Sequence, residues 1–171
     1  GFFAFQAVFV LWSEKVMFVG YDARFVQQAV GYIMTYVGFI GIITQAFLVK
    51  PIVRRFGERS MVAGGLATRS IAFAIMTFFP IIPLVVITVP LISFGQGLVV
   101  PGLTALLTYL VPPDERGYAI GLAEAVQGLG RISGPLIAGL LFDYVSPSAP
   151  MGFAALIGLL SMIVSLALWR I

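Results

Sequence analysis

Long apolar runs alternate along the chain with short segments that are polar, charged or rich in proline. A helix that crosses a bilayer needs about 20 largely apolar residues, and six segments of the sequence meet this requirement. The expected helices cover residues 1–18, 26–49, 60–79, 84–110, 118–144 and 151–169. We therefore predict an all-α integral membrane protein, with residues 1–171 forming one six-helix transmembrane bundle. An inverted repeat of three plus three helices would suit such a unit.

The connections between the expected helices are short. Residues 50–59, KPIVRRFGER, are expected to form a basic loop, and residues 111–117 the turn VPPDERG. Gly57 precedes the next helix, where the turn would use a positive φ angle that glycine adopts easily. Pro90 and Pro101 lie inside the fourth apolar run and are expected to kink its helix.

Lysine and arginine gather in alternate connections, which predicts how the chain is oriented in the membrane. The second connection contains Lys50, Arg54, Arg55 and Arg59, the fourth contains Arg116, and the last helix ends at Arg170. The first, third and fifth connections contain only Arg24. Because positively charged connections stay on the cytoplasmic side, we expect the even connections and both chain ends to face the cytoplasm.

The composition supports a membrane protein and excludes several kinds of chemistry. Of the 171 residues, 60% are hydrophobic and 10% charged, whereas a soluble domain has about 25% charged residues. The chain has no cysteine and no histidine, which removes thiol nucleophiles, the usual general base and the commonest metal ligands. We therefore expect no enzyme activity, no metal site and no organic cofactor. The net charge of +3 is attributed to membrane orientation, not to nucleic-acid binding.

The chain opens at Gly1 directly into an apolar run, without an initiating methionine or the features of a signal peptide. We expect the sequence to start inside a membrane helix and to lack an upstream partner segment.

Residues 121–139 combine an apolar helix with polar side chains that share one face. At roughly 100° per residue, Glu124, Gln127 and Arg131 lie within about 60° of one another, and Pro135 continues the stripe. The small residues beside it, expected to allow close helix packing and bending, are Gly121, Gly130, Gly134 and Gly139. Because polar groups are costly in hydrocarbon, we expect this stripe to line a cavity on the path of substrate or protons.

The depth of the charged side chains of this stripe in the membrane bears on the roles expected for them. Arg131 lies about 20 Å into its helix, and a charge at such depth costs about 2.5 kcal/mol or more without water or a counter-ion. The alternative is a structural arginine that caps carbonyl groups near Pro135. Glu124 is expected to carry a proton, and the alternative is a solvated carboxylate at the interface.

Other polar residues in the expected helices are further candidates. Arg69 is either a cavity residue or the structural partner of a carboxylate elsewhere in the bundle. Gln6 and Gln96 are expected to line the same cavity, or to form hydrogen bonds between helices. The glycines of the fourth helix are expected to permit close packing, and the phenylalanines of the first to face lipid or the core.

Three local patterns resemble the C-terminal six-helix half of a major facilitator superfamily transporter, of the drug:proton antiporter and tetracycline-efflux kind. Residues 45–60, QAFLVKPIVRRFGERS, resemble the family loop G-x-L-x-D-R-x-G-R-R, with Arg55, Gly57 and Arg59 at matching places and Arg54 replacing the aspartate. Residues 107–122, LTYLVPPDERGYAIGL, resemble the turn into the fifth helix of a half. Residues 121–139 are similar to the antiporter motif G-x8-G-x3-G-P-x2-G-G, with Ala138 in place of one glycine.

The resemblance implies a secondary active transporter that exports small amphipathic molecules in exchange for protons by alternating access. The proton gradient would drive it, and its partners would be the bilayer and an N-terminal six-helix half or a second copy. Because Arg54 replaces the aspartate, the gating role of that aspartate in the family does not carry over to this loop. The residues Arg54, Arg55, Gly57, Glu58 and Arg59 are instead expected to form a charged latch on the cytoplasmic side. The alternative is a basic anchor, whose cations gain about 1 kcal/mol each near anionic lipid. A uniporter or symporter of a metabolite remains open as an alternative, as does a membrane scaffold or dimerising half without transport.

Overall fold

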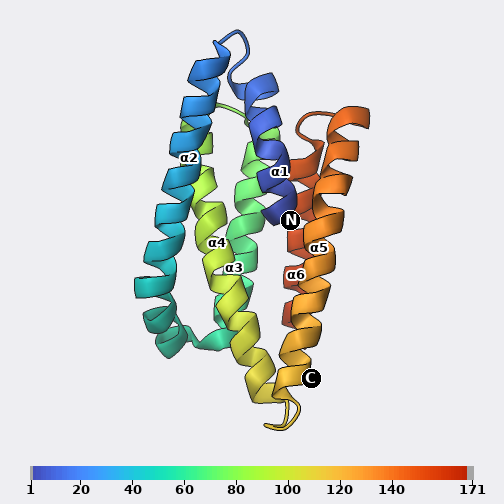
Figure 1. Ribbon diagram of the computed structural model, residues 1–171. Helices are drawn as coiled ribbons and strands as arrows, with labels where there is room; N and C mark the ends of the chain where they lie inside the picture. The colour runs from blue at the N-terminus through green and yellow to red at the C-terminus, as the bar shows by residue number, and fades with distance from the viewer. Residues whose placement is uncertain (1, 169–171) are drawn as a thin grey trace.

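The computed structural model describes residues 2–168, with the side chains of residues 5–167, and this range is almost entirely helical (Figure 1). It contains no β-strand. The elements, in order, are α1 (Phe2–Trp12), η1 (Ser13–Met17), α2 (Ala23–Ile43), η2 (Thr44–Leu48), α3 (Val49–Phe78), α4 (Ile82–Leu110), α5 (Arg116–Tyr144) and α6 (Ala149–Leu168). The two η elements are short π-helical segments that extend α1 and α2. The all-α fold class predicted from the sequence is confirmed.

The helices begin a few residues earlier than the apolar pattern alone indicates. The start of α2 is set by Asp22, whose carboxylate accepts a hydrogen bond of 3.1 Å from the backbone N–H of Arg24. Both α4 and α5 continue through their internal prolines. The expected helix termini at Gly1 and Trp169, and the basic terminus at Arg170, lie outside the described residues.

The prediction of a basic loop at residues 50–59 is wrong. α3 begins at Val49 and is interrupted only at Gly57, which has φ 78° and ψ 164°. The helical conformation continues into this segment directly from η2. The positive φ angle expected at Gly57 is confirmed, and it turns the chain between two helical arms.

Four helical runs among the described residues are long and apolar enough to cross a membrane: Ala23–Phe78, Ile82–Leu110, Arg116–Tyr144 and Ala149–Ala167. The first contains both α2 and α3, and Figure 1 shows the chain reversing direction at its lower end. α1 and η1 together cover residues 2–17 and are not among the four.

The helices contact one another in a pattern that repeats. α3 packs extensively against α4 and α6, α1 packs against α5, and α2 packs against α4. If α1, α2 and α3 correspond to α4, α5 and α6, then the α1–α5 contact corresponds to the α4–α2 contact. The α3–α6 contact corresponds to itself. A repeat of three helices would relate these contacts, whereas the α3–α4 contact is much more extensive than its counterpart, α1–α6.

Glycines allow α3 and α4 to cross at very short distance. A Cβ atom added to Gly65 would lie 2.7 Å from the carbonyl oxygen of Gly95, and one added to Gly95 would lie 2.5 Å from that of Gly65. Lower in the bundle, a Cβ on Gly102 would lie 2.6 Å from Val62. The close packing expected for the glycines of this helix is therefore present.

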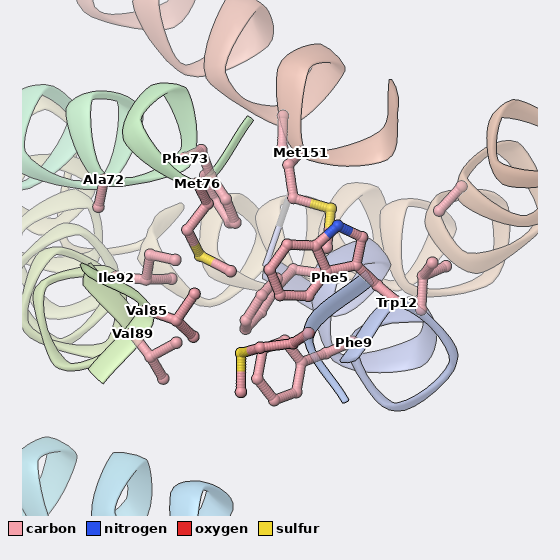
Figure 2. Packing of buried hydrophobic residues seen from close by; sticks show 14 of the residues in the cluster. Phe5, Phe9, Trp12, Ala72, Phe73, Met76, Val85, Val89, Ile92 and Met151 are labelled. Atoms are coloured by element: carbon pink, nitrogen blue, oxygen red, sulfur yellow. The ribbon is translucent and has the colours of Figure 1, made fainter. Parts of the chain in front are cut away.

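The main hydrophobic core lies where α1 meets α3, α4 and α6. Figure 2 shows Phe5, Phe9 and Trp12 of α1 directed towards Phe73, Met76, Val85 and Met151. The rings of Phe5 and Phe73 meet edge to face at 5.4 Å, a favourable arrangement for aromatic pairs. These aromatic side chains of α1 therefore belong to the core, one of the two positions expected for them.

Candidate functional site

Glu124 and Arg131 of α5 form an ion pair on the surface of the six-helix unit. The Oε2 atom of Glu124 lies 3.7 Å from the Nη2 atom of Arg131, and the side chains are 55% and 52% exposed. Gln127, between them on the same face, is half-buried. The spacing of seven residues places the two charges two helical turns apart, a separation their long side chains span.

The same stripe of α5 becomes buried towards the C-terminal end of the helix. Pro135 is half-buried, and Ala138 and Phe142 are buried in the core against α1. The Nζ atom of Lys15 lies 5.0 Å from the centre of the Phe142 ring, and the indole N–H of Trp12 donates a 3.3 Å hydrogen bond to Ser148 Oγ. One helix face thus passes from an exposed ion pair to a packed interface.

The rest of α5 is apolar and mostly uncovered. Leu122, Val126, Leu129, Leu136 and Leu140 are all exposed. In the apolar stretch of α5 that could cross a membrane, only 11% of the residues are buried, against 50% in that of α4. A Cβ atom added to Gly121, Gly130 or Gly139 would meet no other atom within 4 Å. These three glycines therefore make no close contact with another helix among the described residues.

The polar stripe does not lie in any of the three depressions identified on the described surface. One of about 190 Å³, between α5 and α6, is lined on the α5 side by Gly130, Ser133 and Gly134. The others lie between α2 and α4 and at the basic end of the bundle. The role of Glu124, Gln127 and Arg131 in a substrate or proton path stays a prediction.

Arg69 occupies a very different setting, inside the contact between α3 and α4. Its Nη1 atom donates a hydrogen bond of 2.6 Å to Oε1 of Gln96, while its Nε atom is buried without a partner among the described residues. No carboxylate of the described residues lies within 4.0 Å of it. The partner is therefore a neutral amide, not the carboxylate that one of the two alternatives for Arg69 requires.

The uncharged polar groups divide into two kinds. Ser93 Oγ donates a hydrogen bond of 2.9 Å to the carbonyl of Val37 and so connects α4 to α2, a contact that nothing in the sequence pattern singled out. Thr104 and Thr108 instead bond to carbonyls of their own helix. Gln6 is exposed on α1, and its place in a cavity stays a prediction.

The basic segment lies at the end of the bundle that also carries the α4–α5 turn (Figure 1). Arg54, Arg55 and Arg59 are exposed, and Glu58 is half-buried. The guanidinium of Arg55 lies 5.6 Å from the centre of the Phe56 ring, within cation–π range. A role in gating stays a prediction for these residues.

No group of three or more histidine, cysteine, aspartate or glutamate side chains suited to a metal ion occurs in the part of the chain that the structure describes.

Several resistance proteins are similar to this chain in sequence. Tetracycline resistance protein, class C, of Escherichia coli is 29% identical over 165 residues, which is 92% of this chain and 39% of the relative. Multidrug resistance protein 1 of Bacillus subtilis (strain 168) is 28% identical over 155 residues, 90% of this chain and 38% of the relative. Multidrug resistance protein 2 of the same strain is 27% identical over 161 residues, with 93% and 38% covered.

The chain thus spans about two fifths of the length of these relatives. No solved structure matches it at a significant level. The sequence profile of the Major Facilitator Superfamily matches residues 1–171. This chain, with its long apolar helices and its similarity to drug-resistance proteins, therefore belongs to the Major Facilitator Superfamily of transporters.

Proposed function

We propose that this chain is one six-helix half of a transporter that exports small amphipathic molecules in exchange for protons. The resistance proteins named above support an efflux role, and the two fifths of their length that the chain spans supports a further half. That second half is either part of the same polypeptide or another copy. The complete transporter works by alternating access, with the two halves rocking around a site between them.

The observation that carries this proposal is the exposed ion pair on a membrane helix. A charged pair facing hydrocarbon is costly, because neither water nor protein replaces its hydration. Glu124 and Arg131 are both half-exposed on α5, in a helix apolar enough to cross the bilayer. The cost disappears if their face lines a water-filled cleft against the second half, while the leucines of α5 face lipid.

The pair also supplies the chemistry for coupling. When Glu124 accepts a proton its attraction to Arg131 weakens, which changes how the guanidinium group interacts with substrate or with the second half. Proton and substrate drive the motion because they bind the two orientations with different affinity. Gln127 offers an uncharged hydrogen-bond donor and acceptor between the two charges.

The orientation follows from the basic end of the bundle. We place this end, with Arg54, Arg55 and Arg59, at the cytoplasmic face of the cell membrane. There these guanidinium groups grip helix ends or carboxylates of the second half in one state and release them in the other. Glu58 and the turn at Gly57 complete this gating segment.

Transport by the full-length protein in proteoliposomes, driven by an imposed pH gradient, tests the proposal. Arg131→Ala and Glu124→Gln are expected to abolish proton-driven efflux, whereas Leu129→Ala, on the lipid-facing side of α5, retains it. Unchanged flux in both charge variants contradicts the proposal. Substrate flux that ignores the pH gradient in the unmodified protein indicates a uniporter instead, and absence of any flux favours a scaffold.

A further inference from the structure

We propose that the depression at the basic end of the bundle binds the phosphate headgroup of an anionic phospholipid. This site is separate from the Glu124–Arg131 pair, shares Gly57, Glu58 and Arg59 with the proposed gating segment, and concerns the membrane, not the transported molecule.

The depression has a volume of about 520 Å³ and forms where the second arm of α3 begins beside the last turns of α4. Residues 56–60 line one wall, and Leu106, Tyr109 and Leu110 line the other. Gly57 shapes it, because its positive φ angle turns the chain between the two arms of α3. The site therefore combines a charged rim with apolar walls, as an amphipathic ligand requires.

The depression is lined by one arginine, Arg59, and one carboxylate, Glu58, and the cations Lys50, Arg54 and Arg55 precede it in the sequence. Residues 50–59 contain four cations and one carboxylate, Glu58. No ion pair within 4.0 Å involves any of these cations among the described residues. Arg59 lines the depression itself, and Arg55 is held beside it by the contact of its guanidinium with Phe56.

A phosphate diester suits these cations. The planar guanidinium group presents several N–H donors in a fork that matches phosphate oxygens, and Ser60 in the lining adds a hydroxyl donor. Cations near an anionic leaflet gain about 1 kcal/mol each, which corresponds to about a fivefold change in binding for each cation removed.

The walls favour a lipid over a free anion. Phe56, Tyr109 and Leu110 are exposed around the depression, at the end of two helices apolar enough to span the bilayer. Aromatic side chains at such a position lie at the level of the lipid headgroups. Glycerol and the first acyl carbons would cover this apolar surface, which inorganic phosphate leaves exposed to water.

Lipid retention by the full-length protein tests the site. The protein is reconstituted in nanodiscs of phosphatidylcholine with a fixed fraction of phosphatidylglycerol, and native mass spectrometry then counts the lipids that remain bound. The unmodified protein is expected to retain phosphatidylglycerol in preference to phosphatidylcholine. Arg59→Gln lowers that retention about fivefold, and Arg59→Lys, which keeps the charge and loses the fork, lowers it less.

The matched control is Arg24→Gln, which removes an exposed arginine at the opposite end of the bundle. It is expected to leave retention unchanged. Tyr109→Ala keeps every charge and removes part of the apolar wall of the depression. It is expected to lower lipid retention through this loss, so the test does not depend on one variant. Circular dichroism establishes that each variant is folded.

Four results would overturn the proposal: equal retention of the two lipids, no effect of Arg59→Gln in a folded protein, an equal loss in Arg24→Gln, or displacement of phosphatidylglycerol by millimolar inorganic phosphate. The last would identify a site for free phosphate. Failure of proton-driven transport leaves this test unaffected, because it measures bound lipid alone.

Discussion

Two arginines lie far from the ends of their membrane helices, and their surroundings are opposite. Arg69 is inside the α3–α4 contact, where Gly65 and Gly95 bring the backbones together and Gln96 accepts its hydrogen bond. Arg131 lies on the uncovered face of α5 beside Glu124. The sequence places both arginines far from the ends of their helices and does not distinguish between them.

The difference shows that a charged side chain in a membrane helix can have two settings. It is either packed among the helices of its own bundle, or it lies on the surface of the bundle, where it can contact water, substrate or another part of the protein. A buried guanidinium with a neutral partner cannot respond to a proton without breaking the packing around it. A half-exposed guanidinium beside a carboxylate can. Arg69 is thus held in a packed contact within this chain, and the coupling role proposed for Arg131 stays a prediction.

The largest effect on stability is expected in the α3–α4 contact, and the exposed face of α5 provides its control. Gly95→Leu is expected to lower the free energy of unfolding by about 3 kcal/mol or more, because its Cβ atom alone would lie 2.5 Å from the carbonyl oxygen of Gly65. Gly121→Leu on α5 is the control, since a Cβ there meets nothing within 4 Å. We expect its change to stay within about 0.5 kcal/mol. Unfolding of the purified chain in mixed micelles, followed by circular dichroism, measures both, and similar losses would contradict the contrast.

A second experiment tests whether Arg69 depends on Gln96. Gln96→Leu is expected to cost about 1.5–3 kcal/mol, because it leaves a buried guanidinium without its acceptor. Arg69→Met is expected to be neutral or stabilising, since it removes the charge and keeps an apolar chain of similar length. The double variant should then recover the stability that Gln96→Leu loses. An additive loss in the double variant would show that the two side chains are not coupled.

The smallest effect on stability is expected at the residue with the largest effect on function. Arg131→Gln should change the free energy of unfolding by less than about 1 kcal/mol, because exposed ion pairs contribute little. The same variant should lose proton-driven transport in the full-length protein. The same unfolding assay checks the first part, and a loss as large as that of Gln96→Leu would make Arg131 a structural residue too.

Much of the fold follows from the sequence, because the lengths of the apolar runs determine where membrane helices can form. The error at residues 50–59 has a local cause: the charges of this segment favour a loop in the sequence, whereas the helix continues from η2 and turns only at Gly57. The polar stripe of α5 was also predictable, because its members share one helix and one face. The partner of Arg69 was not, since Gln96 is 27 residues away on another helix and only the packing of α3 on α4 brings them together. The contact of Gly65 with Gly95 was hidden for the same reason.

The central claim is that one face of α5 meets water while the other meets lipid. This chain has no cysteine. In a full-length protein whose remaining part is also free of cysteine, single cysteines are introduced at Gln127 and Leu129, which lie at similar depth on different faces of α5. Reaction with a water-soluble, membrane-impermeant thiol reagent is then measured in the full-length protein in membranes. We predict that Gln127→Cys reacts readily and Leu129→Cys does not. Equal reactivity at the two positions, or reaction at Leu129→Cys alone, would contradict the claim.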